Sequence, residues 1–215
     1  MTPDRVVLGG AAVDLVRDAD VVAAVRERLA APTGPPLAIS SANLDHIHHF
    51  GLDGASRRDL DLTAGIPRWS VLLDGAPLVR RADRLTGVSW PRLAGSDLLA
   101  PLLTEAASAG ATVGFLGGVP AMHERLTTVL SQTQPDLKVA GMWAPTRAEL
   151  ADPATAATLV GTVRAAGVDL LVVGLGKPRQ ERWIQRHAAD SGARVLLAFG
   201  AAADFLAGEV SRAPG

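Results

Sequence analysis

Short apolar runs alternate with longer, alanine-rich stretches along most of the chain. Runs of three to six residues rich in leucine or β-branched side chains predict strands buried on both faces, a pattern typical of a parallel sheet. These runs lie at 37–40, 70–73, 112–116, 138–140, 170–174 and 194–199. Residues 6–14 form two short apolar runs around a pair of glycines, which predicts a β-hairpin ahead of that sheet.

The stretches between these runs predict helices at 19–31, 46–64, 77–85, 97–109, 121–134, 146–166 and 178–191. Thr146 and Glu149 match a capping box, and Pro178 suits a first helical turn. Pro101 is unfavourable inside a helix, so we expect it to mark the true start of its helix. The alternation predicts an open, Rossmann-like α/β fold with a mostly parallel sheet, helices on both faces and the N-terminal hairpin, as a single domain over residues 1–215.

Composition narrows the classes of protein. The chain has 215 residues, of which 48% are hydrophobic and 20% charged, and its formal net charge is -1. This balance excludes extensive disorder and offers no basic surface for nucleic acid. The absence of cysteine excludes disulfides, thiolate catalysis and zinc–thiolate sites. Apolar runs are too short for a membrane span, and charges interrupt the N-terminal apolar residues, so we expect a soluble or peripheral protein without a secretory signal.

Polar residues that follow predicted strands are candidates for a site, because open α/β sheets bind ligands beyond the carboxyl ends of their strands. Ser41 and Asn43 follow the 37–40 strand. They can hold sugar hydroxyls or a phosphate oxygen, or they can cap the next helix. Asp74 follows the 70–73 strand, where partial burial would raise its pKa towards that of a general base. The alternative is again a helix cap.

Arg92 precedes a small-residue turn at 93–98. A guanidinium there can pair with a diphosphate, or it can be an ordinary surface charge while Ser96 or Asp97 caps the following helix.

Glycines follow two more strands, at Gly117 and Gly118 and at Gly174 and Gly176. Such loops let backbone N–H groups meet an anion at a helix N-terminus. Arg179 stands where the third glycine of a dinucleotide fingerprint would be, which argues against a nicotinamide oxidoreductase. The chain also lacks a phosphate-binding Gly-Lys-Ser/Thr motif and a Gly-x-Ser-x-Gly motif.

Histidines and tryptophans have simpler interpretations. His46, His48 and His49 are expected to be exposed or capping residues and not a metal site, because no second ligand cluster accompanies them. The tryptophans are expected in the core or at interfaces. Trp143 is the exception, since it follows a strand end and could stack on a base.

Read in order, these motifs resemble the WecG/TagA/CpsF family of bacterial glycosyltransferases. The matching stretches are 41–43, 74–75, 92–98, 115–118, 141–143, 174–181, 203–205, 207–208 and Arg212-Ala213-Pro214. Each is unspecific alone, but their joint order and spacing are specific.

The resemblance implies an inverting, metal-independent transferase that uses no cofactor. It would move N-acetylmannosamine, its uronic acid or a related hexose from a UDP-sugar to a polyprenyl-diphosphate-linked sugar during cell-surface polysaccharide synthesis, in the cytoplasm at the inner face of the plasma membrane. By position, Asp74 would be the general base, and Ser41, Asn43 and Arg92 would line the donor and acceptor pocket. The nucleotide would meet Gln180, Asp204 and the residues Gly117, Gly118, Trp143, Gly174 and Gly176.

The sequence departs from the family pattern at its end. Family members normally continue past Arg212-Ala213-Pro214 with a basic amphipathic segment that docks on the membrane, whereas this sequence ends at Gly215. We therefore expect that this appendage is lacking. A soluble acceptor, and a non-catalytic module that binds a nucleotide or a partner, stay open as alternatives. Since family members often self-associate, a homo-oligomer is also an expectation.

Overall fold

The strands form one sheet in a computed structural model that describes residues 4–57, 60–63 and 65–208. Within these residues the sheet has eight strands in the order β1-β2-β4-β3-β8-β7-β5-β6. They are β1 (Arg5–Leu8), β2 (Ala11–Asp14), β3 (Leu37–Ala42), β4 (Arg68–Leu73), β5 (Thr112–Gly117), β6 (Lys138–Trp143), β7 (Leu170–Gly174) and β8 (Val195–Ala198). Among the described strands, β1 and β2 pair antiparallel and the remaining pairs are parallel. The predicted open α/β fold and its N-terminal hairpin are confirmed.

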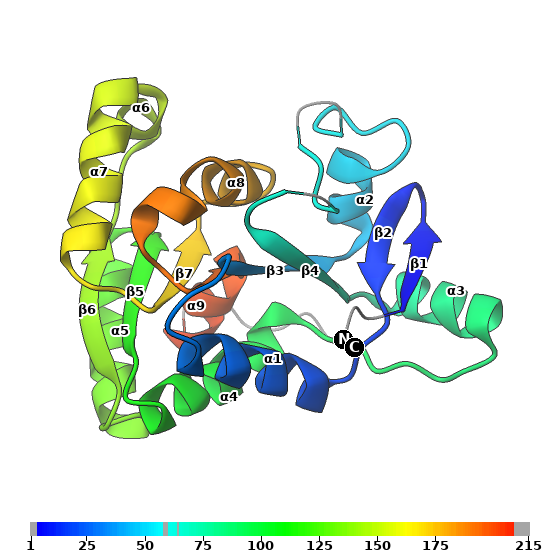
Figure 1. Cartoon of the computed structure of the whole chain (residues 1–215), viewed down its shortest axis with the longest axis horizontal. Helices are drawn as coiled ribbons and strands as arrows, with labels where there is room; N and C mark the ends of the chain where they lie inside the picture. Colours follow the sequence, from blue (N-terminus) through cyan, green and yellow to red (C-terminus); the bar gives the residue numbers. More distant parts are fainter. Residues whose placement is uncertain (1–3, 58–59, 64, 209–215) are drawn as a thin grey trace.

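Helices cover both faces of the sheet (Figure 1). They are α1 (Asp18–Ala30), α2 (Leu44–Phe50), α3 (Ala76–Thr86), α4 (Gly95–Ser108), α5 (Pro120–Thr133), α6 (Arg147–Ala151), α7 (Pro153–Ala165), α8 (Arg179–Ser191) and α9 (Gly200–Leu206). Helices α1, α4, α5 and α9 bury apolar side chains on one face, and α2, α3, α7 and α8 on the other. In the described residues, none of these helices has the length and apolar character that a membrane crossing requires.

Each central strand contributes to two cores, which explains its unbroken apolar sequence. In β3, Leu37 and Ile39 pack towards α1, while Ala38 and Ala42 pack towards the opposite helices. Successive side chains of a strand point to opposite faces, so a sheet covered on both sides needs apolar residues at every position.

One predicted helix is much shorter than expected. The 46–64 prediction is wrong, because α2 begins at Leu44 and ends at Phe50. Gly51 caps its C-terminus, with the N–H group donating to the carbonyl of Ile47. A Cβ on Gly54 would lie 2.3 Å from the carbonyl oxygen of His49, so the chain folds back tightly on α2 there. Gly51 and Gly54 thus end a helix that the hydrophobic pattern alone predicts to continue.

The predicted helix at 146–166 is divided into α6 and α7. The capping box of Thr146 and Glu149 is confirmed at the start of α6. Asp152 then caps α7 by accepting a hydrogen bond from the N–H of Thr155 at 2.8 Å, and Pro153 takes its first position. A proline there has no N–H to lose, so it starts a helix well and continues one poorly.

Helix α4 begins earlier than Pro101 indicated. It starts at Gly95, after an N-cap residue, Ala94, that has no side-chain cap, so the predicted caps by Ser96 or Asp97 are wrong. Pro101 lies inside the helix. Gly95 packs against the ring of Phe199, where a Cβ would come within 2.8 Å, and this contact fixes the first turn of α4 against the segment before α9.

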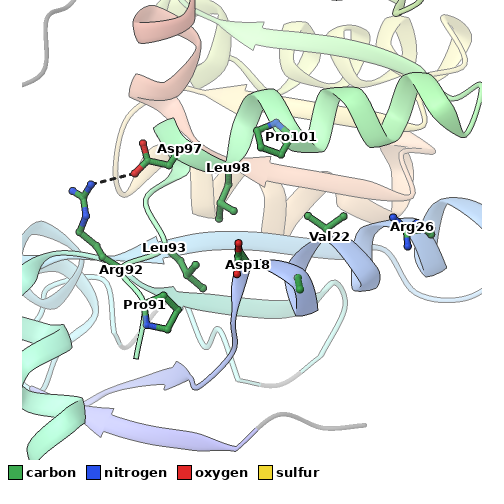
Figure 2. A pocket seen from close by; sticks show the side chains of 10 residues that line it. Asp18, Val22, Arg26, Pro91, Arg92, Leu93, Asp97, Leu98 and Pro101 are labelled. Carbon is green, nitrogen blue, oxygen red and sulfur yellow. Dashed lines mark hydrogen bonds and ion pairs between the residues drawn. The ribbon is translucent and has the colours of Figure 1, made fainter. Parts of the chain in front are cut away.

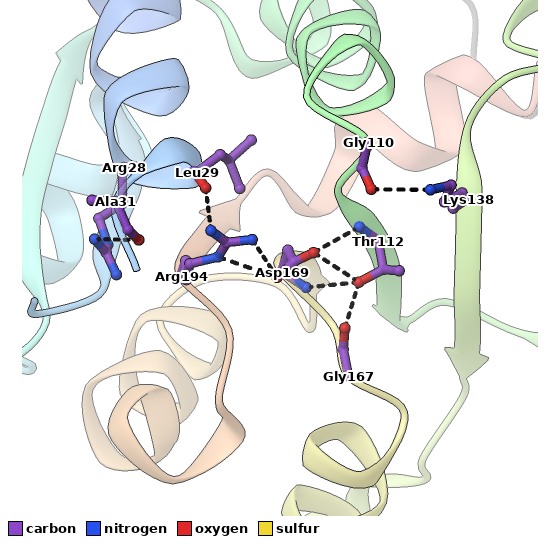
Figure 3. A network of polar contacts seen from close by, with 9 residues as sticks. All are labelled: Arg28, Leu29, Ala31, Gly110, Thr112, Lys138, Gly167, Asp169 and Arg194. Carbon is purple, nitrogen blue, oxygen red and sulfur yellow. Dashed lines mark hydrogen bonds and ion pairs between the residues drawn. The ribbon is translucent and has the colours of Figure 1, made fainter. Parts of the chain in front are cut away.

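A polar network fastens the amino ends of β5, β7 and β8 (Figure 3). Asp169 accepts hydrogen bonds from the Thr112 N–H at 2.9 Å and from Arg194 Nη2 at 2.7 Å. Arg194 also donates to the carbonyl of Leu29 at the end of α1. Burial raises the pKa of Asp169, but the bonds from Thr112 and Arg194 outweigh this effect and hold the pKa below its usual value. This edge is therefore structural.

Candidate active site

The carboxyl ends of β4, β3, β8, β7 and β5 bring most of the predicted site residues to the opposite edge. Asp74 follows β4, and its N–H donates to the carbonyl of Ala42 at the end of β3 at 2.9 Å. At the other side, Gly117 of β5 pairs with Gly174 of β7. Because neighbouring strands are about 4.8 Å apart, β4 and β5 are separated by roughly 19 Å. The edge therefore has one half that contains Asp74 and another half that is rich in glycine.

Asp74 lies half-buried at the turn between β4 and α3. Its Oδ1 accepts a hydrogen bond from the N–H of Gly75 at 2.7 Å. Gly75 has a φ of 82° and is itself the N-cap of α3, which has no side-chain cap. The alternative in which Asp74 caps this helix is therefore wrong. Burial raises the pKa of Asp74. Neighbouring positive charges lower this pKa, but by less than burial raises it.

Ser41 and Asn43 end the neighbouring strand. Ser41 is buried in β3, beside the strand that leads to Asp74. Asn43 caps α2, since its side-chain oxygen accepts a hydrogen bond from the N–H of His46 at 3.0 Å. The capping interpretation of Asn43 is confirmed, while contact of either residue with a sugar stays a prediction.

Arg92 is brought close to Asp74 by the segment before α4. The N–H of Leu93 donates to the carbonyl of Leu73 at 2.7 Å, which holds this segment against the end of β4. The guanidinium of Arg92 is half-exposed and pairs with Asp97 at 3.1 Å. Figure 2 shows this pair at the rim of a groove between α1 and α4. The groove has a volume of about 490 Å³. The apolar residues of the groove include Val22, Leu93, Leu98 and Pro101.

A narrow crevice occupies the glycine-rich half of the edge. Gly117, Gly118, Gly174, Gly200 and Asp204 are among the residues that line it, and its volume is about 10 Å³, the room of a single water. A Cβ on Gly117 would lie 2.1 Å from the carbonyl oxygen of Gly174, and the φ of 113° at Gly117 disfavours any other residue. Burial raises the pKa of Asp204. Four of the residues predicted to contact the nucleotide therefore line this one crevice, namely Gly117, Gly118, Gly174 and Asp204.

Gln180 lies in the first turn of α8, next to Gly200 of the crevice. It is 3% exposed, and its Nε2 donates to the carbonyl of Ala198 at 2.9 Å. Its Oε1 is buried and has no hydrogen-bond partner among the described residues, and it lies 2.6 Å from where a Cβ on Gly200 would stand. Gly176 has a φ of 73°, and its carbonyl accepts a hydrogen bond from the N–H of Gln180 at 3.0 Å. The carboxamide thus joins the first turn of α8 to the end of β8, and its contact with a nucleotide stays a prediction.

Trp143 is placed away from the crevice. Its ring fills the space above two glycines, where a Cβ on Gly114 or Gly141 would approach within 2.9 and 2.5 Å. This is the sheet face covered by α7 and α8, whereas Met142 packs on the α5 face that carries the crevice. The structure therefore sets Trp143 against the core and does not bring it to the other nucleotide-binding candidates.

The burial of three side chains near Asp74, those of His46, Lys177 and Glu181, was not predicted from the sequence. His46 is 1% exposed, and burial, with smaller contributions from the charges of Lys177 and His49, lowers its pKa to about 3. The expectation of an exposed or capping histidine is wrong for His46, although His48 is exposed. Lys177 and Glu181 form a buried pair in the loop and first turn of α8. Their spacing of four residues at a helix start was the available signal.

Among the described residues, no group of three or more potential ligands could hold a metal ion. Arg212, Ala213 and Pro214, which contributed to the family resemblance, lie outside the described residues.

Comparison with known proteins bears on what this edge does. A sequence model of the Glycosyl transferase WecG/TagA/CpsF family matches residues 6–215. Similar proteins include the N-acetylglucosaminyldiphosphoundecaprenol N-acetyl-beta-D-mannosaminyltransferases of Staphylococcus aureus strains MRSA252 and NCTC 8325. Each is 27% identical over 144 residues, which are 67% of this chain and 54% of the relative. The chain thus spans about half the length of the curated relatives that it matches. With the family model covering nearly the whole sequence, the chain belongs to the WecG/TagA/CpsF family of glycosyltransferases.

Proposed function

We propose that this chain is a glycosyltransferase that moves an N-acetylmannosamine-like sugar from a UDP-sugar to a hydroxyl of a lipid-linked N-acetylglucosamine. The observation that carries the proposal is Asp74, a half-buried carboxyl with a raised pKa at the carboxyl edge of the sheet. The family and the names of the curated relatives support this class of reaction and acceptor.

In the proposed mechanism, Asp74 is the general base. Its carboxylate takes the proton of the acceptor hydroxyl while the oxygen attacks the anomeric carbon. The bond from that carbon to the diphosphate oxygen breaks on the opposite face, and UDP leaves with the electron pair, which inverts the configuration. A carboxyl whose pKa is raised by burial accepts this proton more readily than an exposed one.

The donor would lie at the glycine-rich half of the edge. A crevice of about 10 Å³ is too small for a nucleobase, so we propose that the nucleotide lies across its mouth, next to Gly118 and Asp204. Backbone N–H groups at Gly117 and Gly118 precede α5, and such groups can stabilise the charge that grows on the departing diphosphate. In this proposal the reaction uses no metal ion and no cofactor.

The acceptor would approach from the half that contains Asp74. Arg92 stands there at a rim open to solvent, and its guanidinium suits a diphosphate. Because the lipid anchor of such an acceptor lies in a membrane, we propose that the enzyme works at the cytoplasmic face of the plasma membrane as a peripheral protein. Self-association is part of the same expectation.

The variant Asp74→Asn tests the mechanism. Loss of the base should lower the transfer rate by about a hundred- to ten-thousand-fold, while UDP affinity measured by calorimetry stays close to that of the wild type. Asp190→Asn, at an exposed position of α8, is the control and should transfer normally. Unchanged turnover in Asp74→Asn would remove this residue from the mechanism.

The wild-type chain separates the proposal from its alternatives. Transfer to a water-soluble acceptor but not to a lipid-linked one would identify a soluble acceptor. Binding of UDP without transfer to any supplied acceptor would indicate a nucleotide-binding module.

A further inference from the structure

The loop between β7 and α8 places a buried lysine next to the turn that carries Asp74. The Lys177 side chain is 10% exposed. Its ammonium donates to the carbonyl of Ser41 at 3.0 Å and lies 3.9 Å from Oε1 of Glu181. Ser41 immediately precedes Ala42, whose carbonyl accepts the N–H of Asp74. The loop thus fixes a positive charge beside the proposed base.

Glu181 restrains this ammonium from the side of α8. The carboxyl is fully buried, and its Oε1 accepts hydrogen bonds from the Ser40 hydroxyl at 3.0 Å and from Gln180 Nε2 at 3.2 Å. Burial raises the pKa of Glu181, and the charge of Lys177 opposes that rise. Strand β3, the loop between β7 and α8, and α8 itself therefore meet at one buried polar cluster near Asp74.

Four groups act against the effect of burial on Asp74. Burial raises its pKa, whereas the N–H of Gly75, the charges of Arg92 and Lys177, and the hydroxyl of Ser41 each lower it. The two cations come from different elements, Arg92 from the segment before α4 and Lys177 from the loop before α8.

The two cations differ in their surroundings. Arg92 is half-exposed and shares its charge with Asp97, so solvent and ions screen it. Lys177 is largely buried, and the groups that face it are the Glu181 carboxyl from α8 and the His46 ring from α2, which is neutral because burial lowers its pKa to about 3. The charge of Arg92 lowers the pKa of Asp74 more than the charge of Lys177 does, but Lys177 is the cation that the fold holds in place.

We propose that Lys177 is a positioning residue for Asp74: its fixed ammonium helps to keep the Asp74 carboxyl ionised, and so able to accept the proton of the acceptor. The inference rests on the proposed function for the role of Asp74. The interaction between the two charges does not depend on it and can be measured without substrate.

Carbon-13 NMR titration of the side-chain carboxyls tests the interaction in the whole chain. The Asp74 signal is assigned by its loss in Asp74→Asn. In Lys177→Met the Asp74 titration curve should move to higher pH, because an opposite charge is removed, and Lys177→Arg should stay near the wild type. The chain has one other lysine, Lys138, at the far edge of the sheet, and Lys138→Met should leave the curve in place.

Kinetics provide the second measurement. If the wild type transfers sugar, Lys177→Met should lose about tenfold in rate at pH below the wild-type Asp74 pKa and recover as the pH rises. If the wild type transfers nothing, the proposed function fails and the titration still decides the inference. Lys177→Gln, which keeps a donor for the Ser41 carbonyl, replaces Lys177→Met should that variant not fold. An unmoved titration curve in a folded, uncharged variant overturns the proposal.

Discussion

At the scale of single residues, the glycines of this fold separate into those that the structure requires and those that it tolerates. Gly117 stands at the β5–β7 contact with a φ of 113° and the carbonyl of Gly174 against it. Gly161 lies in α7, with nothing within 4 Å of where its Cβ would be. The same substitution should therefore have opposite effects at the two positions.

Gly117→Ala should destabilise the fold by about 1 kcal/mol or more, since it combines backbone strain with a clash. Gly161→Ala should stabilise it by about 1 kcal/mol, because alanine is the better residue in a helix. Urea unfolding of both variants measures the difference. If both substitutions changed the free energy of unfolding equally, the ends of β5 and β7 would have room to move apart at Gly117 and Gly174.

His46 gives the fold a specific sensitivity to acid. Its pKa is lowered from 6.5 to about 3, so between these values the unfolded chain binds a proton that the folded chain does not. Stability should therefore fall as the pH decreases from 6.5 towards 3, at up to about 1.4 kcal/mol per pH unit from this residue. Unfolding at a series of pH values should show a flatter dependence in His46→Leu than in the wild type. His48→Leu, at an exposed position, should keep the wild-type slope.

At the scale of elements, the network around Asp169 should matter for stability and not for the site. Asp169→Asn weakens the bonds to Thr112 and Arg194 that fasten β5, β7 and β8. It should cost about 2 kcal/mol, as expected for hydrogen bonds to a charged group. The pKa of Asp169 is lowered by folding, so its contribution is present at neutral pH and is lost as the pH falls through the folded-state pKa.

Denaturant unfolding at pH 7 measures that cost, and the affinity for UDP, the proposed donor nucleotide, should not change at a temperature where the variant is folded. A loss of UDP affinity in folded Asp169→Asn would contradict the separation of the two edges.

The elements also show where the sequence was informative. Strand positions were predictable, because burial on both faces leaves a continuous apolar signature. Helix ends were less so. The end of α2 depends on Gly51 and Gly54, which are tolerated in a helical pattern until tertiary contacts use them as a turn. The start of α4 depends on Gly95 meeting Phe199, a contact between residues far apart in the sequence.

At the scale of the molecule, the parallel sheet made the site partly predictable. Residues after β4, β5 and β7 were expected to share an edge, and Asp74, Gly117 and Gly174 do. The sequence did not predict which face of the sheet a side chain takes. Trp143 packs against the core on one face, whereas the crevice lies on the other face. The buried pair of Lys177 and Glu181 also escaped notice, since only the fold brings it beneath Asp74.

The distribution of amines has a practical consequence for measuring binding. Lys138 is exposed at the amino edge of the sheet, where its ammonium reaches the carbonyl of Gly110 at 3.4 Å (Figure 3), and Lys177 is largely buried. Apart from the α-amino group, amine coupling therefore favours attachment through Lys138. A sensor surface prepared in this way would hold the molecules with their carboxyl edge turned towards the solution, accessible to nucleotide and to lipid vesicles alike.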